Sequence, residues 1–153
     1  MTPGTDAAPE RILCDTTYIS VRLAAVARPE FVAHWPADVT DRLEQAVLMV
    51  SVVSLAELRG GQIGANFPPE KVERHRRVID AYVPAPLDPD VSEVWAHLWA
   101  WRKSNPSGIN DNDLWIAATA ISRKWPLVSC DRHFIDVPDL DHIYLQRTPD
   151  SRN

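Results

Sequence analysis

The segment LMVSVVSLAE, residues 48–57, carries the clearest fold signal in this chain. Residues 48–53 are largely apolar and β-branched on both faces, a pattern typical of a parallel strand buried inside a sheet. Ser54 and Glu57 then have the S-x-x-E spacing of a helix N-terminus, so we expect a helix capped by Ser54. A buried strand that passes directly into a helix predicts an α/β fold around a parallel sheet.

The rest of the chain repeats this alternation of short apolar runs and amphipathic segments. Strands are predicted at residues 11–15, 48–53, 127–129 and 143–145. Helices are predicted from residue 16 to before Pro29, from residue 36, from residue 54 to about 64, and at residues 69–82, 90–104 and 111–124. Residues 83–89 contain three prolines and are expected to be extended. The pattern predicts an α/β/α sandwich around a mostly parallel sheet, with residues 1–10 as a flexible leader, 11–148 as a single domain and 149–153 as a tail.

The composition is that of a globular protein that folds without disulfides. The chain has 153 residues, of which 45% are apolar and 24% are charged. A single domain of this length buries roughly 70% of the surface that its unfolded chain exposes. No apolar run approaches the ~20 residues of a membrane span, and residues 1–10 lack the features of a secretory signal. Cys14 and Cys130 are too few for a disulfide framework, so we expect reduced thiols in the cytoplasm and no membrane association.

The net charge argues against one class of nucleic-acid binder. The chain has 16 basic and 21 acidic residues, a formal charge of −5. A protein that holds nucleic acid by bulk electrostatics is normally basic. The composition therefore excludes a simple electrostatic coat or groove binder, and leaves open where the acidic excess lies.

Four acidic side chains stand where the fold itself does not need them. Asp15 ends the first predicted strand, and Glu57 lies on the first turn of the helix after the second. Asp113 is near the start of the helix at residues 111–124, and Asp131 lies just beyond the strand at 127–129. Because strand ends and the following helix starts share one edge of a parallel sheet, these carboxylates are expected to converge and to raise one another's pKa unless a cation neutralises them. Oxygen ligands of this kind suit Mg²⁺ or Mn²⁺, and two such ions about 3.5–4 Å apart can activate water against a phosphodiester.

Each acid also has a structural interpretation. Asp15 could cap the helix that follows it, and Glu57 could be the partner of the Ser54 cap. Asp113 could favour the positive end of its helix dipole, and Asp131 could start a turn. The joint placement of the four favours the functional interpretation.

The residues around these acids resemble the motifs of PIN-domain ribonucleases. The matching blocks are Cys14-Asp15-Thr16-Thr17 for D-[TS]-[SN], residues 51–61 for S-x-x-[ST]-x-x-E-[LI]-x-x-G, residues 112–120 for N-D-x-x-I-A-A-x-A, and residues 128–134 for [VL]-[TS]-x-D-x-x-F. The helix block at 112–120 is the most specific of them. Their order and the chain length resemble the VapC toxins of bacterial VapBC toxin–antitoxin pairs, over about residues 11–146.

This resemblance implies a Mg²⁺- or Mn²⁺-dependent endoribonuclease that cleaves structured cellular RNA and is neutralised by a VapB antitoxin. By motif position, the catalytic and metal-binding carboxylates would be Asp15, Glu57, Asp113 and Asp131. The hydroxyls of Thr16 and Ser129 would orient a ligand, the metal or its water. The resemblance also implies a homodimer, and an antitoxin whose C-terminal segment lies over the acidic site.

Neighbouring polar residues have simpler interpretations. Asp111 is two residues before Asp113 and cannot share its helix face, so we expect a cap or a first-turn charge. His133 could contact a phosphate or be structural. Strand alternation points Cys14 and Cys130 away from the acids next to them, toward the core.

The basic residues leave RNA contact open. Residues 71–77 place Lys71 and Arg74, with Arg77 or Arg76, along one side of a predicted helix. Such charges could contact RNA, but they are often solvated faces.

Two other functional classes remain to be weighed against a nuclease. One is a degenerate PIN domain that binds RNA or an antitoxin without cleavage. The other is a phosphotransfer protein, which also places Asp at strand ends. Asp15-Thr16-Thr17 fits neither the acidic pair of receiver domains nor the D-x-D-x-T of dehalogenase-type phosphatases.

Overall fold

The computed structural model describes residues 7–148 of the chain. Most of the leader predicted for residues 1–10 and all of the tail predicted for 149–153 lie outside the described residues. Within them, no helix is both long enough and apolar enough to cross a membrane.

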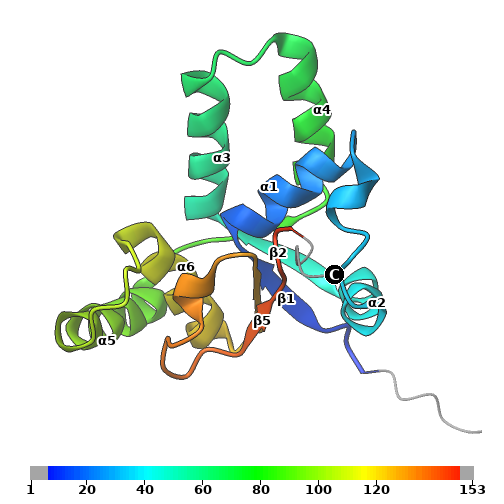
Figure 1. Ribbon diagram of the computed structural model, residues 1–153. Coiled ribbons are helices and arrows are strands. Elements are labelled where there is room, and N and C mark those ends of the chain that lie inside the picture. The colour runs from blue at the N-terminus through cyan, green and yellow to red at the C-terminus, as the bar shows by residue number, and fades with distance from the viewer. Residues whose placement is uncertain (1–6, 149–153) are drawn as a thin grey trace, which may run out of the picture.

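Among the described residues, five parallel strands form one sheet. They are β1 (Arg11–Cys14), β2 (Val47–Ser51), β3 (Val83–Ala85), β4 (Leu127–Ser129) and β5 (His142–Tyr144). The sequence predicted four of them and predicted only an extended segment at residues 83–89, where β3 lies. The strand order in the sheet is β3-β2-β1-β4-β5, and every neighbouring pair is parallel; Figure 1 labels β1, β2 and β5. In the central strand, Leu13 is paired with Met49 on one side and Leu127 on the other.

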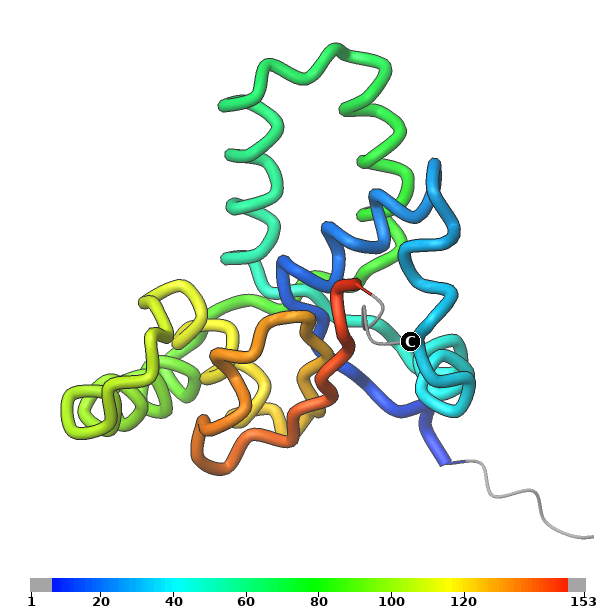
Figure 2. The backbone as a smooth tube through the Cα atoms, in the orientation of Figure 1, coloured from blue at the N-terminus to red at the C-terminus, as the bar shows by residue number. Residues whose placement is uncertain are grey.

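Within residues 7–148, six α-helices and two short 3₁₀ helices connect the strands. They are α1 (Thr16–Ala25), η1 (Pro29–Phe31), α2 (Ala37–Gln45), α3 (Val52–Gly64), α4 (Pro69–Ile79), α5 (Pro89–Ser104), α6 (Asp111–Arg123) and η2 (Arg132–Phe134). Figure 1 shows α3 and α4 extending together away from the sheet, and Figure 2 traces the chain between them at the far end. The α/β/α prediction is confirmed, while η1 and η2 were not predicted.

Strand alternation divides the core between the two faces of the sheet. Leu13 and Met49 belong to the cluster that includes α5 and α6. Ile12, Cys14 and Val50 belong to the opposite cluster, with residues of α1 and α2. Because successive strand residues point to opposite faces, one strand supplies both layers. Cys14 is fully buried, as predicted.

The boundary between β2 and α3 differs from the prediction. The strand ends at Ser51, and the helix begins at Val52 instead of Ser54. Ser51 is the helix cap, because its Oγ accepts from the Val53 N–H at 3.2 Å. Ser54 therefore lies inside the first turn, where it is fully buried and its hydroxyl has no hydrogen-bond partner among the described residues. The prediction of a Ser54 cap was wrong because an earlier hydroxyl, three residues upstream, satisfies the helix N-terminus.

Two ion pairs tie α5 to its surroundings. Asp88 caps α5 by accepting from the Val91 N–H at 3.0 Å, and its other oxygen pairs with Arg123 of α6. Arg102 pairs with Asp111 at 2.6 Å. Asn110 caps α6, so Asp111 is a first-turn charge, one of the two structural roles expected for it.

Candidate active site

The four acids lie together at the carboxyl edge of the sheet. Asp15 stands between β1 and α1, and Glu57 lies in α3. Asp113 is in the first turn of α6, and Asp131 follows β4. Burial, followed by the charges of Asp131, Asp15 and Glu57, raises the pKa of Asp113 to about 6. The side chains are therefore close enough to repel one another, as the sequence led us to expect.

Asp15 is both a helix cap and a member of this acidic group. Its side chain is 1% exposed, and its Oδ1 accepts from the Tyr18 N–H at 2.8 Å. Thr17 Oγ1 lies 2.8 Å from both carboxylate oxygens, and Ser129 Oγ donates to Oδ2 at 2.9 Å. Burial raises the pKa of Asp15 to about 6, although all of these hydrogen bonds oppose the shift. The cap interpretation and the site interpretation of Asp15 are thus compatible.

Hydroxyl groups link the acids to one another. Thr16 Oγ1 donates to Glu57 Oε1 at 2.7 Å. Ser129 Oγ, besides contacting Asp15, accepts from the Asp131 N–H at 2.8 Å. Groups of this kind fix the rotamers of carboxylates that bind metals. Thr16 and Ser129 therefore lie where their predicted roles would require.

Thr17 belongs to the same network and was missed by sequence reasoning. Its Oγ1 contacts the Asp15 carboxylate and accepts from the Cys130 N–H at 3.0 Å. The contact fixes the end of β4 against the start of α1. The motif contains two adjacent threonines, and only the hydrogen bonds show that they serve different carboxylates.

Asp113 has the least compensated carboxylate of the four. Its side chain is 8% exposed, and the Asn110 cap binds its backbone N–H, not its carboxylate. Among the described residues, no side chain donates a hydrogen bond to the carboxylate of Asp113, and no lysine or arginine pairs with Asp15, Glu57 or Asp113. Buried negative charge without a compensating group is costly.

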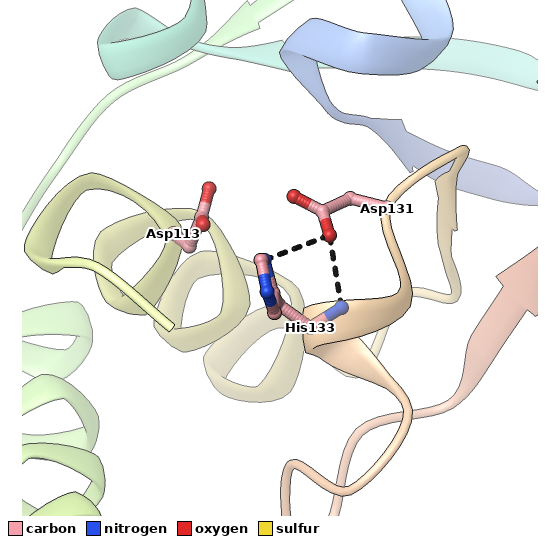
Figure 3. A group of neighbouring side chains, drawn as sticks. All are labelled: Asp113, Asp131 and His133. Carbon is pink, nitrogen blue, oxygen red and sulfur yellow. Dashed lines mark hydrogen bonds and ion pairs between the residues drawn. The ribbon is translucent and has the colours of Figure 1, made fainter. Parts of the chain in front are cut away.

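Asp131 and His133 form a second contact group beside Asp113. Asp131 Oδ1 accepts from the His133 N–H at 2.9 Å and lies 3.0 Å from His133 Nδ1. One ligand atom each from Asp113, Asp131 and His133 lie within 4.8 Å of one another (Figure 3). Asp131 thus caps a turn, as its structural interpretation proposed, while its carboxylate remains at the acidic edge. In the sequence, the only indication that His133 lies beside Asp131 was the D-x-H spacing of the two residues.

The donor set fits a divalent cation. It consists of carboxylate oxygens from Asp15, Glu57, Asp113 and Asp131, with a nearby imidazole nitrogen. Hard divalent ions such as Mg²⁺ and Mn²⁺ take oxygen ligands of this type. A bound cation would also offset the repulsion that raises the pKa of Asp113.

A groove opens beside the acidic edge, between α1, α3 and α4. Its volume is about 590 Å³, and its lining includes Thr16 and Glu57. Apolar side chains such as Leu23, Leu58 and Val78 line it, together with the cations Arg28, Lys71 and Arg74. The groove therefore joins an apolar surface to the site.

The basic side chains of α4 fall into two groups. Arg76 pairs with Glu73 at 2.8 Å and with Asp80 at 2.6 Å, and Arg77 pairs with Glu73 at 3.3 Å. Lys71 and Arg74 instead line the groove, where the Lys71 ammonium lies 3.5 Å from the ring centroid of Phe67. The face predicted from residues 71–77 is thus partly neutralised within its own helix.

Known proteins resemble this chain in sequence and in fold. The family model for the PIN domain matches residues 20–140. Ribonuclease VapC4 of Mycobacterium tuberculosis (strain ATCC 25618 / H37Rv) is 33% identical over 98 residues, which are 63% of this chain and 75% of the relative. Ribonuclease VapC5 of the same strain is 34% identical over 87 residues, 55% of this chain and 64% of the relative.

Solved structures share the fold at lower identity. VapBC2 from Rickettsia felis, bound to a DNA fragment from its promoter, has a TM-score of 0.72 at 18% identity, covering 89% of this chain and 99% of that one. VapBC-5 from Mycobacterium tuberculosis has a TM-score of 0.64 at 24% identity, covering 90% and 100%.

Proposed function

The chain belongs to the PIN-domain family, in which it resembles the VapC ribonucleases, and from this premise we propose that it is a divalent-metal-dependent endoribonuclease. Its substrate would be structured cellular RNA. It would act in the cytoplasm as the toxin of a type II toxin–antitoxin pair. The observation that carries the proposal is the convergence of three further acidic charges on the buried carboxylate of Asp113, with no lysine or arginine paired to it among the described residues.

The four acids would hold Mg²⁺ or Mn²⁺ at the edge of the sheet. When bound, such an ion supplies a water of lowered pKa and positive charge beside the scissile phosphate. The chain's own hydroxyls would keep the ligands in place: Ser129 fixes Asp15, and Thr16 fixes Glu57. Hydrolysis by water would leave a 5′-phosphate and a 3′-hydroxyl.

We further propose that a VapB-type antitoxin occupies the groove beside the site. The apolar lining between α1, α3 and α4 fits an amphipathic peptide segment, and the groove reaches Thr16 and Glu57. The C-terminal segment of such a partner could continue from the groove over the acidic edge. The structural relatives described above include VapBC complexes. A homodimer is also proposed, and light scattering of the purified chain would test it.

Mapping of RNA 5′ ends after induction of the gene in cells would test the proposed function. The Asp113→Asn variant is the matched control, because it removes one carboxylate charge with almost no change in shape. We expect new 5′ ends at defined positions with the wild type and none with the variant. Equal end patterns from the two proteins would contradict a nuclease site at Asp113. If calorimetry also detected no divalent-ion binding, the non-cleaving binding module would be the better description.

A further inference from the structure

We infer that His133 is a nitrogen ligand in a metal position shared with Asp113 and Asp131, and that it makes this position favour Mn²⁺ over Mg²⁺. The inference rests on the proposed function, because it assumes that a divalent metal binds at the acidic edge. It goes beyond that proposal because it adds a residue from outside the four acids and assigns a preference between ions.

The geometry around His133 suits shared coordination of one ion. His133 Nδ1 lies 3.0 Å from Asp131 Oδ1, and the ligand atoms of the three side chains lie within 4.8 Å of one another. In an octahedral site with bonds of about 2.1 Å, adjacent ligand atoms lie about 3 Å apart. Figure 3 shows the ring of His133 projecting toward the space between the two carboxylates. A divalent ion could therefore bind both Nδ1 and Oδ1 with little movement of either side chain.

Two backbone features hold the ring in this place. Asp131 caps η2 by accepting from the His133 N–H at 2.9 Å, so the carboxylate is fixed against the backbone that carries the ring. Gly108 has a φ of +73°, and a Cβ built there would lie 3.2 Å from His133 Nε2 and 3.3 Å from Cδ2. Only glycine adopts this conformation readily and leaves room for the ring.

A structural role accounts poorly for the position of His133. Its side chain is 53% exposed, so the ring contributes little buried surface to the core. A phosphate contact is also less suitable for Nδ1, because that atom faces a carboxylate of the same charge sign as a phosphate. A cation placed beside Nδ1 would instead be attracted by the Asp131 carboxylate and could bind both atoms.

The donor chemistry gives the ion preference. Mg²⁺ is a hard ion that takes oxygen ligands and keeps its waters. An imidazole nitrogen instead favours the first-row transition metals. A set of two carboxylates and one imidazole should therefore discriminate against Mg²⁺.

Pulsed EPR of the full chain loaded with Mn²⁺ would test the inference. A directly bound imidazole gives a ¹⁴N coupling to the Mn²⁺ electron spin, which a residue acting only on packing would not give. We expect this coupling in the wild type and its loss in His133→Gln. His97→Gln is the matched control, because His97 is exposed on α5 and pairs only with Glu93 among the described residues; it should keep the coupling.

Affinity titrations provide the second readout. In His133→Gln, the Kd for Mn²⁺ should rise by about tenfold or more, while the Kd for Mg²⁺ should change much less. Gly108→Ala keeps the imidazole in the chain but crowds it, so it should also weaken Mn²⁺ binding. The inference is overturned if the wild type shows no nitrogen coupling, if it binds no Mn²⁺, or if His133→Gln weakens the binding of both ions equally.

The failure of this inference can be told apart from failure of the proposed function. RNA cleavage by a wild-type protein whose Mn²⁺ shows no nitrogen coupling would overturn the role of His133 and leave the nuclease intact. Nitrogen coupling in a protein that cleaves no RNA would support the metal position and contradict the nuclease.

Discussion

The hydroxyl of Thr16 donates a 2.7 Å hydrogen bond to Oε1 of Glu57, and this contact joins the first turn of α1 to α3. The two residues are 41 positions apart in the chain. Thr16 directly follows Asp15, so the hydrogen bond holds two acidic motifs of the site in one arrangement. It provides a direct way to perturb the site without removing a charge.

Replacing Thr16 with valine should weaken metal binding while leaving the fold intact. Valine keeps the shape of threonine but cannot donate to Glu57, so the carboxylate gains rotamer freedom. Loss of such a supporting hydrogen bond typically costs about 10–100-fold in metal affinity or activity. Calorimetry with Mn²⁺ should show this loss for Thr16→Val and near-normal affinity for Thr16→Ser.

Thr40→Val is the matched control for this experiment. Thr40 is on α2, and among the described residues its hydroxyl donates only to the Ala37 carbonyl, at 3.0 Å. Equal losses in Thr16→Val and Thr40→Val would show that the Thr16 hydroxyl has no specific role at the site.

The metal-free protein should lose stability as the pH rises from about 4 to about 6. Asp15 and Asp113 have a pKa of about 6 in the folded protein and an ordinary value of 3.8. Between these values the folded state binds more protons than the unfolded state, so the free energy of unfolding falls with increasing pH. The contribution of the two groups is fully present below about pH 4 and is lost above about pH 6.

Urea denaturation in EDTA across this pH range would measure the effect. The double variant Asp15→Asn/Asp113→Asn should show a smaller decrease in the free energy of unfolding from pH 4 to pH 6. If the free energy of unfolding changed by the same amount from pH 4 to pH 6 in the wild type and in the double variant, the raised pKa of the two acids would be contradicted.

Asp113→Asn alone should raise the melting temperature of the metal-free protein at pH 7.5. It removes a buried charge that is repelled by three acids and has no donor among the described side chains. Asp88→Asn makes the same chemical change where the carboxylate is paired with Arg123. It should lower the free energy of unfolding by about 1 kcal/mol. Calorimetric scans in EDTA would compare the two variants with the wild type. If both variants were destabilised, the negative charge of Asp113 would not be unfavourable in the folded protein.

RNA affinity should depend on Lys71 and Arg74 more than on Arg76 and Arg77. The first pair lines the groove, whereas the second is paired with acids of α4. If each groove cation contacts one phosphate of single-stranded RNA, losing both should reduce the salt slope of binding by about 1.4. Fluorescence anisotropy with the Asp113→Asn protein in EDTA would compare Lys71→Ala/Arg74→Ala with Arg76→Ala/Arg77→Ala. Equal effects of the two double substitutions would argue against RNA contact in the groove.

Most of the sheet was predictable, because short runs that are apolar on both faces indicate strands buried in a parallel sheet. The edge strand β3 was predicted only as an extended segment, because it contains Pro84. Residues 11–14 are apolar except for Arg11, and residues 127–129 are apolar except for Ser129. Consecutive apolar residues of this kind are typical of a strand that is covered on both faces. The start of α3 was not predictable to the residue. Ser51 and Ser54 have the same capping chemistry, and the choice between them depends on where β2 separates from its neighbours.

The proximity of the acids followed from topology, but their environment did not. Parallel strands bring Asp15 and Asp131 to one edge whatever the loops do. The hydrogen bond between Thr17 and Cys130 spans 113 residues, and the place of His133 depends on the turn at Gly108. Such contacts depend on loop geometry, for which a short sequence motif carries little information.

The end chemistry of RNA cut by the purified protein tests the central claim most directly. If the four carboxylates hold a metal that activates water, wild-type protein with Mn²⁺ should produce fragments with a 5′-phosphate and a 3′-hydroxyl. EDTA and Asp113→Asn should each abolish cleavage. Fragments with a 5′-hydroxyl and a cyclic 2′,3′-phosphate, or cleavage that persists in EDTA and in Asp113→Asn, would contradict a metal-dependent site at these acids.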